Sequence, residues 1–274
     1  MEGGGWGGGR SLAQDARPFA RRGGQAGPPA DVLSARCYHA AVPRRARGKF
    51  ITIEGLDGCG KSTQLEKLAG VLRAEGCDVI LTREPGGTPV GERMRAVLLD
   101  SATSDLSPWA ELALMFAARA QHVEEVILPS LAAGKYVLCD RFTDSSEAYQ
   151  GGGRKLGSEP VQALHRILCH DLQPDLTILM LSDVGASVAR ARRRNLARTP
   201  TVAPSTGKPP ADENRFERES RAFFERVLNA YQAIARREPQ RVFAVDASRP
   251  VGVVHKEIVG AVRERLLGKK ASSF

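Results

Sequence analysis

The fold of this chain is decided by residues 50–63, which read Phe50-Ile51-Thr52-Ile53-Glu54-Gly55-Leu56-Asp57-Gly58-Cys59-Gly60-Lys61-Ser62-Thr63. A short β-branched run leads into a glycine-rich turn, and an amphipathic helical pattern follows from Lys61 to about Glu75. The turn fits G-x-x-x-x-G-K-S/T, which marks a phosphate-binding loop when a strand precedes it and a helix follows it. The glycines let backbone N–H groups converge on phosphate oxygens, and the helix adds the positive end of its dipole. The stretch therefore predicts a strand, a phosphate loop and a helix, in that order.

The predicted loop points to a nucleoside triphosphate as ligand. Lys61 is expected to reach the β- and γ-phosphates, and the Ser62 hydroxyl to ligate Mg²⁺. The same loop serves GTPases, motor ATPases and small-molecule kinases, so it does not choose the reaction. The predicted ATP-binding residues are Gly55, Leu56, Asp57, Gly58, Cys59, Gly60, Lys61, Ser62 and Thr63.

Four further apolar runs follow the first strand. They are Val79-Ile80-Leu81, Tyr136-Val137-Leu138-Cys139, 176–181 and Val242-Phe243-Ala244-Val245, and helical patterns separate them, among them helices near 89–100 and 108–133. Continuous apolar strands that alternate with helices indicate a parallel sheet covered on both faces. The predicted fold class is therefore α/β, a P-loop NTPase fold with a five-stranded parallel sheet and helices on both faces. Such sheets bind ligands at the carboxyl ends of their strands.

Composition separates the first residues from the rest. Residues 1–48 hold ten of the 28 glycines and show no apolar periodicity, so we predict a disordered Gly/Arg-rich extension there. A targeting peptide also fits, because the segment is rich in Arg and poor in acids, and an over-extended gene start stays open. Residues 49–274 are predicted to form one nucleotide-binding domain.

The charge and the cysteines exclude several classes of protein. The net charge is +9, but residues 50–274 hold 31 Lys and Arg against 28 Asp and Glu, so the body is nearly balanced. We therefore expect no specific nucleic-acid partner, and any DNA binding would come from the extension. No run of about 18 apolar residues occurs, so no membrane-spanning helix is expected. The five cysteines include no CxxC pair, which disfavours zinc and disulfides and favours a cytoplasmic location.

Charged residues follow the second and third predicted strands. Asp140-Arg141 ends the third strand, and an acid there fits a Walker-B role in holding Mg²⁺. A simple salt bridge at the strand end is the alternative. The second strand ends in Arg83-Glu84-Pro85-Gly86-Gly87-Thr88, which again brings a cation, an acid and a glycine turn to the ligand edge.

Five segments in this order make residues 49–268 resemble the bacterial thymidylate kinases. They are the phosphate loop, Thr82–Thr88, Phe116-Ala117-Ala118-Arg119-Ala120-Gln121-His122, Asp140-Arg141-Phe142, and Ser145-Ser146-Glu147-Ala148-Tyr149-Gln150-Gly151-Gly152-Gly153-Arg154. The resemblance implies transfer of the γ-phosphoryl group of ATP to dTMP, giving dTDP and ADP for dTTP biosynthesis, with Mg²⁺ as cofactor. It also implies a homodimer through helices that flank the sheet.

The resemblance assigns residues to the dTMP site as well. It implies that Phe116 stacks on thymine, that Arg119 hydrogen-bonds the base and that Arg141 clamps the acceptor phosphate. The family usually places the stacking aromatic four residues before the arginine, which is Met115 here, so the choice between Met115 and Phe116 stays open. The resemblance also implies that Asp57 binds the 3′-hydroxyl and that Tyr149 lies against the 2′ carbon. The full implied set is Asp57, Arg83, Glu84, Phe116, Arg119, Arg141, Ser145, Ser146, Tyr149 and Gln150.

A mobile lid is predicted over residues 190–217. The run Arg190-Ala191-Arg192-Arg193-Arg194 precedes a segment, 197–211, that holds four prolines. The phosphate loop has no arginine between its glycines, so the resemblance implies that the lid supplies positive charge to the transferred phosphoryl group. A solvated basic helix face is the alternative. The predicted catalytic residues are Lys61, Arg141, Arg194 and Arg215.

The sequence leaves three function classes to weigh. A nucleoside monophosphate kinase for dTMP comes first, and a related kinase acting on another acceptor, such as a deoxynucleoside, is its nearest alternative. A GTPase switch is disfavoured, because no N/T-K-x-D string for reading guanine occurs. A nucleic-acid-binding protein is suggested only by the extension and the net charge.

Overall fold

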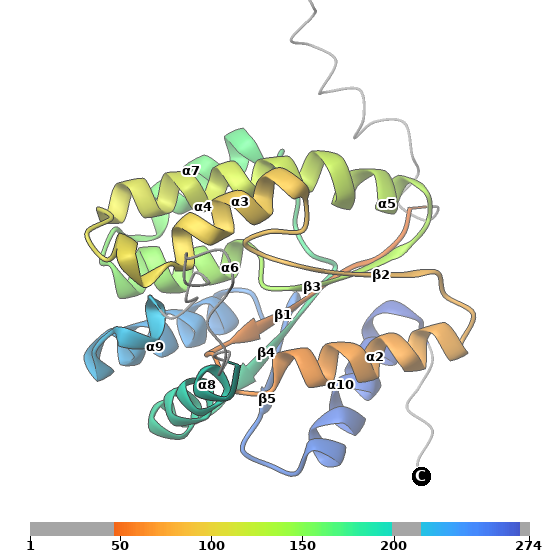
Figure 1. The fold of residues 1–274 in the computed structure, drawn as a ribbon. Helices are drawn as coiled ribbons and strands as arrows, with labels where there is room; N and C mark the ends of the chain where they lie inside the picture. Colours follow the sequence, from red (N-terminus) through yellow and green to blue (C-terminus); the bar gives the residue numbers. More distant parts are fainter. Residues whose placement is uncertain (1–46, 199–214, 269–274) are drawn as a thin grey trace, which may run out of the picture. The chain divides into compact units, whose positions relative to one another are not determined.

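The computed structural model describes residues 47–198 and 215–268. The chain divides into two units, Met1–Ala41 and Val42–Phe274, and every described residue belongs to the second. This unit is built on a five-stranded parallel sheet of order β2-β3-β1-β4-β5 (Figure 1). The predicted α/β class with a five-stranded parallel sheet is therefore confirmed. The strands are β1 (Phe50–Gly55), β2 (Val79–Arg83), β3 (Tyr136–Asp140), β4 (Leu176–Leu181) and β5 (Val242–Asp246).

Helices connect the strands as the sequence predicts. The long helix expected near 108–133 consists of α4, a π-helical turn (η2, Val123–Ile127) and α5 in direct succession. A second π-helical stretch, η3 (Glu147–Gly153), follows α6. The α-helices are α2 (Lys61–Ala74), α3 (Pro89–Leu99), α4 (Pro108–His122), α5 (Leu128–Ala132), α6 (Thr143–Ser146), α7 (Ser158–Leu168), α8 (Val184–Arg198), α9 (Arg221–Arg237) and α10 (Val251–Leu266).

Side-chain caps explain where α3 and α4 begin. The Thr88 side chain accepts a hydrogen bond from the Gly91 N–H, and the Ser107 side chain accepts one from the Ala110 N–H. In both helices the first helical residue is a proline, whose missing N–H would have no partner at that position anyway.

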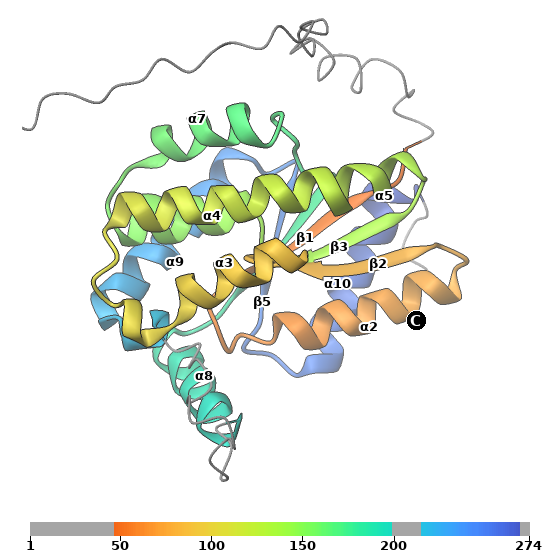
Figure 2. The ribbon, with the colours of Figure 1, turned by 45° about the horizontal axis from the view of Figure 1, so that its top comes forward.

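The central strand β1 is buried on both faces. Ile51 and Ile53 pack in one cluster with residues of α2 and α10, whereas Phe50 packs in another with residues of α4 and α7. The two ribbon views agree with this, because α2 and α10 lie on one side of the sheet and α3, α4 and α7 on the other (Figures 1 and 2). Successive side chains of a strand point to opposite faces, so a continuous apolar run is what a sheet between two helical layers requires.

Glycines in η3 allow α9 to pack directly against it. A Cβ on Gly152 would lie 2.7 Å from the Ala230 Cβ, and one on Gly153 would lie 2.5 Å from the Phe223 ring. Side chains at these two positions would push α9 away. The glycine string of residues 151–153 therefore serves helix packing, and it fixes the neighbouring Tyr149 and Gln150 relative to α9.

The predicted extension, residues 1–48, lies outside the described residues except for its last two. The Arg47 guanidinium lies 3.2 Å from the Asp175 carboxylate, and the Gly48 N–H donates to the Leu131 carbonyl over 2.8 Å. A Cβ on Gly48 would lie 1.8 Å from the Lys135 carbonyl oxygen. Both residues are thus attached to the folded body. Within the described ranges, no helix is long and apolar enough to cross a membrane.

Deleting residues 2–46 is expected to leave the melting temperature and the activity unchanged, because the segment has no core-forming pattern. Deleting residues 2–48 should lower the melting temperature, since it also removes the Arg47 ion pair and the Gly48 hydrogen bond. Thermal unfolding of both variants checks this. If deleting residues 2–46 alone lowers the melting temperature by more than a few degrees, the prediction that this segment does not pack on the folded body is wrong.

Candidate active site

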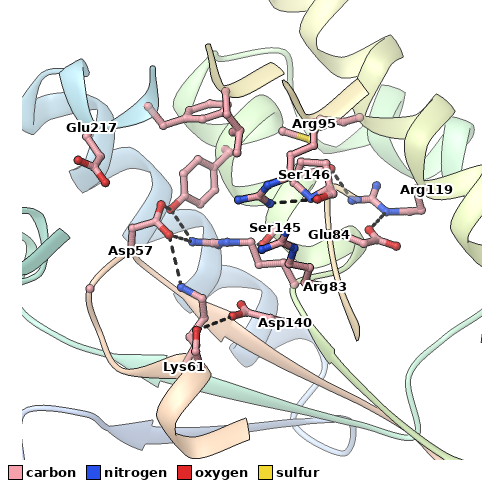
Figure 3. A pocket seen from close by; sticks show the side chains of 18 of the residues that line it. Asp57, Lys61, Arg83, Glu84, Arg95, Arg119, Asp140, Ser145, Ser146 and Glu217 are labelled. Atoms are coloured by element: carbon pink, nitrogen blue, oxygen red, sulfur yellow. Dashed lines mark hydrogen bonds and ion pairs between the residues drawn. The ribbon is translucent and has the colours of Figure 1, made fainter. Parts of the chain in front are cut away.

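The carboxyl ends of β1, β2 and β3 border one cavity of about 540 Å³ (Figure 3). The strand register places Asp140 opposite Ile53 of β1 and opposite Arg83 of β2, so the strand ends meet at one edge. This is the edge at which the sequence predicted a ligand. The predicted site residues that line the cavity are Asp57, Gly58, Gly60, Lys61, Ser62, Thr63, Arg83, Glu84, Arg119, Asp140, Arg141, Ser145, Ser146, Tyr149 and Gln150.

The phosphate loop holds Lys61 at its centre. The ammonium donates to the carbonyl oxygens of Gly55 and Leu56, over 3.2 and 2.9 Å, and lies 3.7 Å from the Asp57 carboxylate. Gly58 and Gly60 have φ angles of 80° and 101°, which side-chain-bearing residues rarely adopt. The loop backbone therefore positions the amine before any ligand binds. Gly55, Leu56 and Cys59 do not line the cavity, and the side chains of Leu56 and Cys59 are buried in the core.

Helix α8 crosses the phosphate loop at Gly58. A Cβ there would lie 2.3 Å from the Ser187 carbonyl oxygen and 2.9 Å from the Ala191 nitrogen, so only glycine allows this approach. The contact brings Arg190 to the cavity wall, where its Nε donates to the Gly58 carbonyl over 2.8 Å. Arg190 was not among the predicted catalytic residues, although it begins the basic run of the predicted lid. Helical spacing was the available signal, because Arg190 lies one turn before Arg194 in α8.

Of the two lid arginines predicted to be catalytic, only Arg215 has a described side chain, and it does not line the cavity. The Arg215 side chain is buried, and it donates to the Leu98 carbonyl and to the Glu111 carboxylate, each over 2.6 Å. Its charge is thereby neutralised beneath α3 and α4, and this arrangement does not support the predicted role of Arg215 at the phosphoryl group. The Arg194 side chain lies outside the described residues, as do residues 199–214 of the predicted lid, so the prediction for Arg194 stays untested.

The two candidates for the stacking position, Phe116 and Met115, lie differently with respect to the cavity. Phe116 is fully buried in the cluster between the sheet and α4, and it does not line the cavity. Met115 lines it instead, together with Arg119. Neighbouring helical residues point about 100° apart, so only one of the pair can face the site. Phe116 instead makes a cation–π contact with Arg119, whose Cζ lies 4.6 Å from the centre of the Phe116 ring.

The proposed metal ligands lie together at the loop. The Ser62 hydroxyl donates to Asp140 Oδ2 over 3.1 Å (Figure 3). The other oxygen, Oδ1, is buried and has no hydrogen-bond partner among the described residues. An unsatisfied buried carboxylate oxygen is costly unless a ligand or water completes it. A hydroxyl and a carboxylate are also the oxygen ligands that Mg²⁺ prefers, so these residues fit that ion.

Arg141 is the most heavily bonded side chain facing the cavity. It has a φ of 74°, in the left-handed region that non-glycine residues avoid. Its guanidinium donates to the Asp57 carboxylate over 2.8 Å, and to the hydroxyls of Ser145, Tyr231 and Tyr149 over 3.0, 3.1 and 3.2 Å. Burial lowers the pKa of Arg141, but Asp57, Tyr149, Tyr231 and Asp140 together outweigh it and raise the pKa well above its ordinary value. The group therefore stays charged.

A buried carboxyl group, Glu54, lies behind Arg141. It accepts hydrogen bonds from the Phe142 N–H over 2.7 Å and from the hydroxyls of Ser145 and Tyr231 over 2.6 and 3.0 Å. Burial, reinforced by the nearby Asp144, raises the pKa of Glu54 to about 7, and Arg141 opposes this shift only in part. Glu54 and Tyr231 were not among the predicted site residues, because no local motif links a strand to α9.

Arg119 forms the other end of the cavity. Its Nε donates to the Glu84 carboxylate over 2.6 Å, and its Nη2 donates to the Ser146 hydroxyl and the Phe142 carbonyl over 2.9 and 3.2 Å. Its Nη1 is buried and has no hydrogen-bond partner among the residues that the structure describes. This end of the cavity therefore offers a charged donor to an acceptor atom of a ligand.

Replacing Glu54 with glutamine is expected to change how stability depends on pH. The ordinary pKa is 4.5 and the folded-state pKa about 7, so the folded protein binds more protons than the unfolded chain between these values. The free energy of unfolding of the wild type therefore decreases as the pH rises through that window. The variant shows no such decrease, because it has no carboxyl group to titrate at this position. The stability of the variant relative to the wild type should rise between about pH 5 and about pH 8 in urea denaturation. A constant difference would contradict the raised pKa.

The comparisons with known proteins agree with this geometry. The family model for thymidylate kinase matches residues 53–258. The thymidylate kinase of Bordetella pertussis is 50% identical over 218 residues, covering 80% of this chain and 96% of the relative. That of Methylobacillus flagellatus is 47% identical over 218 residues, covering 80% and 98%, and that of Pseudomonas putida is 47% identical over 209 residues, covering 76% and 93%. The chain thus belongs to the thymidylate kinase family, as the five sequence segments indicated.

Proposed function

We propose that this member of the thymidylate kinase family transfers the γ-phosphoryl group of ATP to dTMP, giving dTDP and ADP. Family membership makes the chain a nucleoside monophosphate kinase, a phosphotransferase. One observation carries the assignment of the site. A single cavity is lined by the phosphate loop around Lys61, by the charged Arg141 and by Arg119, whose buried Nη1 has no hydrogen-bond partner among the described residues.

ATP would bind through the phosphate loop. The loop N–H groups and Lys61 would hold the β- and γ-phosphates, with Ser62 and Asp140 as the residues that hold Mg²⁺. When bound, Mg²⁺ would neutralise charge on the phosphate oxygens. The Lys61 ammonium now bonded to two loop carbonyls has a third donor for a phosphate oxygen.

The acceptor phosphate would bind to Arg141. Its planar guanidinium would bind two phosphate oxygens by exchanging some of its present acceptors, because four of its five N–H groups are already bonded to protein. Asp57 and Tyr149 line the same stretch of the cavity, which suits contact with the sugar. Tyr149 has its hydroxyl engaged with Arg141 and Asp57, so its ring is the part left to contact the 2′ carbon.

The base would be read by Arg119. Its unpartnered Nη1 can only donate, so it favours a carbonyl oxygen, as in thymine, over the amino group that cytosine carries at the same ring position. Met115, Ser146 and Gln150 line this end of the cavity and would complete the base site. Arg83 and Glu84 would act beside them, with Glu84 holding Arg119 rather than touching the base.

Arg190 is our first choice for the lid charge on the transferred phosphoryl group. It lines the cavity and already bonds to the phosphate loop at Gly58, whereas Arg215 is neutralised by Glu111. Arg194, one turn further along α8, stays a candidate. The homodimer, the cytoplasmic location and the absence of a specific nucleic-acid partner stay predictions of the sequence.

A coupled assay of ADP release tests the function. With ATP, we expect turnover with dTMP, much slower turnover with dCMP because of its amino group, and none with thymidine, which offers Arg141 no phosphate. A matched preparation of Lys61→Ala, expected to be inactive, excludes a contaminating kinase. The proposal fails if dTMP is not phosphorylated, or if thymidine or another nucleotide is the better acceptor.

Replacing Arg190 with alanine should lower kcat roughly a hundredfold, the loss expected when a charged donor to the transition state is removed. KM for dTMP should change little, because the contact is made chiefly in the transition state. Arg193→Ala is the matched control, since Arg193 is exposed on the same helix and does not line the cavity. Equal kcat values for the two variants would return the role to Arg194 or to another segment.

A further inference from the structure

A chain of buried hydrogen bonds connects Arg119 to His122, which does not line the cavity. His122, on α4, is fully buried. Its Nδ1 lies 2.9 Å from Glu84 Oε1, and its Nε2 lies 2.6 Å from the Thr82 hydroxyl. The other oxygen of Glu84 accepts from Arg119 Nε over 2.6 Å. The His122 ring and the Arg119 guanidinium therefore each bind one of the two oxygens of the Glu84 carboxylate.

Chemistry fixes the direction of these bonds. Burial would raise the pKa of Glu84, but Arg119 and His122 together outweigh it and lower the pKa below its ordinary value. An ionised carboxylate can only accept, so His122 must donate from Nδ1. In the neutral ring, Nε2 is then the acceptor, and the Thr82 hydroxyl is its donor. Thr82 thus selects the tautomer that Glu84 needs.

We propose that His122 is a positioning residue for dTMP, which acts through Glu84 to aim the Nη1 of Arg119 at the base. This rests on the proposed function. With both oxygens occupied, the Glu84 carboxylate cannot rotate without breaking the bond to Arg119 or the bond to His122. Nε and Nη2 of Arg119 are both anchored, so the guanidinium plane is fixed and Nη1 is the donor that stays available.

A glycine packed against the histidine supports this role independently. Gly87 has a φ of 78°, and a Cβ there would lie 2.6 Å from His122 Cδ2 and Nε2 and 2.8 Å from the Thr82 hydroxyl. Any side chain would push the ring off Thr82. Gly87 therefore leaves the space that the hydrogen bond between His122 and Thr82 needs.

The same residues do not suit a cation. Ligand atoms of Glu84, His122 and Cys139 lie within 4.8 Å of one another. However, both Glu84 oxygens and both His122 nitrogens already have protein partners, and the Cys139 thiol donates to the Arg141 carbonyl over 3.0 Å. Burial also raises the pKa of this thiol well above its ordinary value, so the thiolate that a metal would need is disfavoured.

Two polar isosteres separate positioning from simple packing. In His122→Asn the amide nitrogen takes the place of Nδ1 and keeps the donor to Glu84, whereas in His122→Gln it takes the place of Nε2 and loses that donor. Full-length variants are compared by steady-state kinetics and by calorimetric titration of dTMP and of ATP. We expect His122→Gln to raise KM and Kd for dTMP about tenfold, the effect of losing one hydrogen bond to a charged group. His122→Asn should stay close to the wild type, and Kd for ATP should not change in either.

Thr82→Val, which removes only the tautomer-selecting hydroxyl, should weaken dTMP binding in the same direction by a smaller factor, and it tests the chain even if a His122 variant fails to fold. The proposal is overturned if the Asn and Gln variants lose dTMP affinity equally, if ATP binding weakens in parallel, or if Thr82→Val binds dTMP as the wild type does. Wild-type protein that fails to phosphorylate dTMP would instead refute the proposed function, so the two failures are distinguishable.

Discussion

The site depends on how one partly buried guanidinium, that of Arg141, is held. Four hydrogen-bond acceptors reach it from four parts of the chain: Asp57 from the phosphate loop, Ser145 from α6, Tyr149 from η3 and Tyr231 from α9. A charge buried without partners would be far too costly, so these elements must come together for the fold to exist. The same interaction joins the half of the cavity suited to a triphosphate to the half suited to the acceptor.

Glycines make that convergence sterically possible. Gly58 lets α8 lie on the phosphate loop, Gly152 and Gly153 let α9 lie against η3, and Gly87 leaves room for His122. In each case a Cβ would collide with backbone or with a packed side chain. Only the glycines of the phosphate loop are also suited to hold an anion. Many of the glycines in the motifs that identify the family therefore serve packing: they let helices and side chains approach closely, and so bring polar side chains to one cavity.

The fold could be predicted because its strands are apolar runs between helical patterns, and all five are found within a few residues of their predicted bounds. Much of the site followed, because parallel strands deliver their carboxyl ends to one edge, which places Arg83 and Asp140 beside the phosphate loop. Side-chain direction was harder to foresee. Arg215 lies in the predicted lid, but its side chain binds Glu111, 104 residues away. The choice between Met115 and Phe116 depends on a rotation of about 100° around the helix. Glu54 and Tyr231 meet through a contact spanning 177 residues, which no local pattern reveals.

The claim that Arg141 joins the two halves is tested most directly by Arg141→Lys. Lysine keeps the charge but lacks the planar guanidinium that bonds to the four protein acceptors and would bind the phosphate. Calorimetric titration should find dTMP affinity lowered by roughly a hundredfold, in line with the loss of a bidentate charged contact, while ATP affinity stays within about threefold of the wild type. Wild-type affinity for dTMP in a folded Arg141→Lys protein would contradict it.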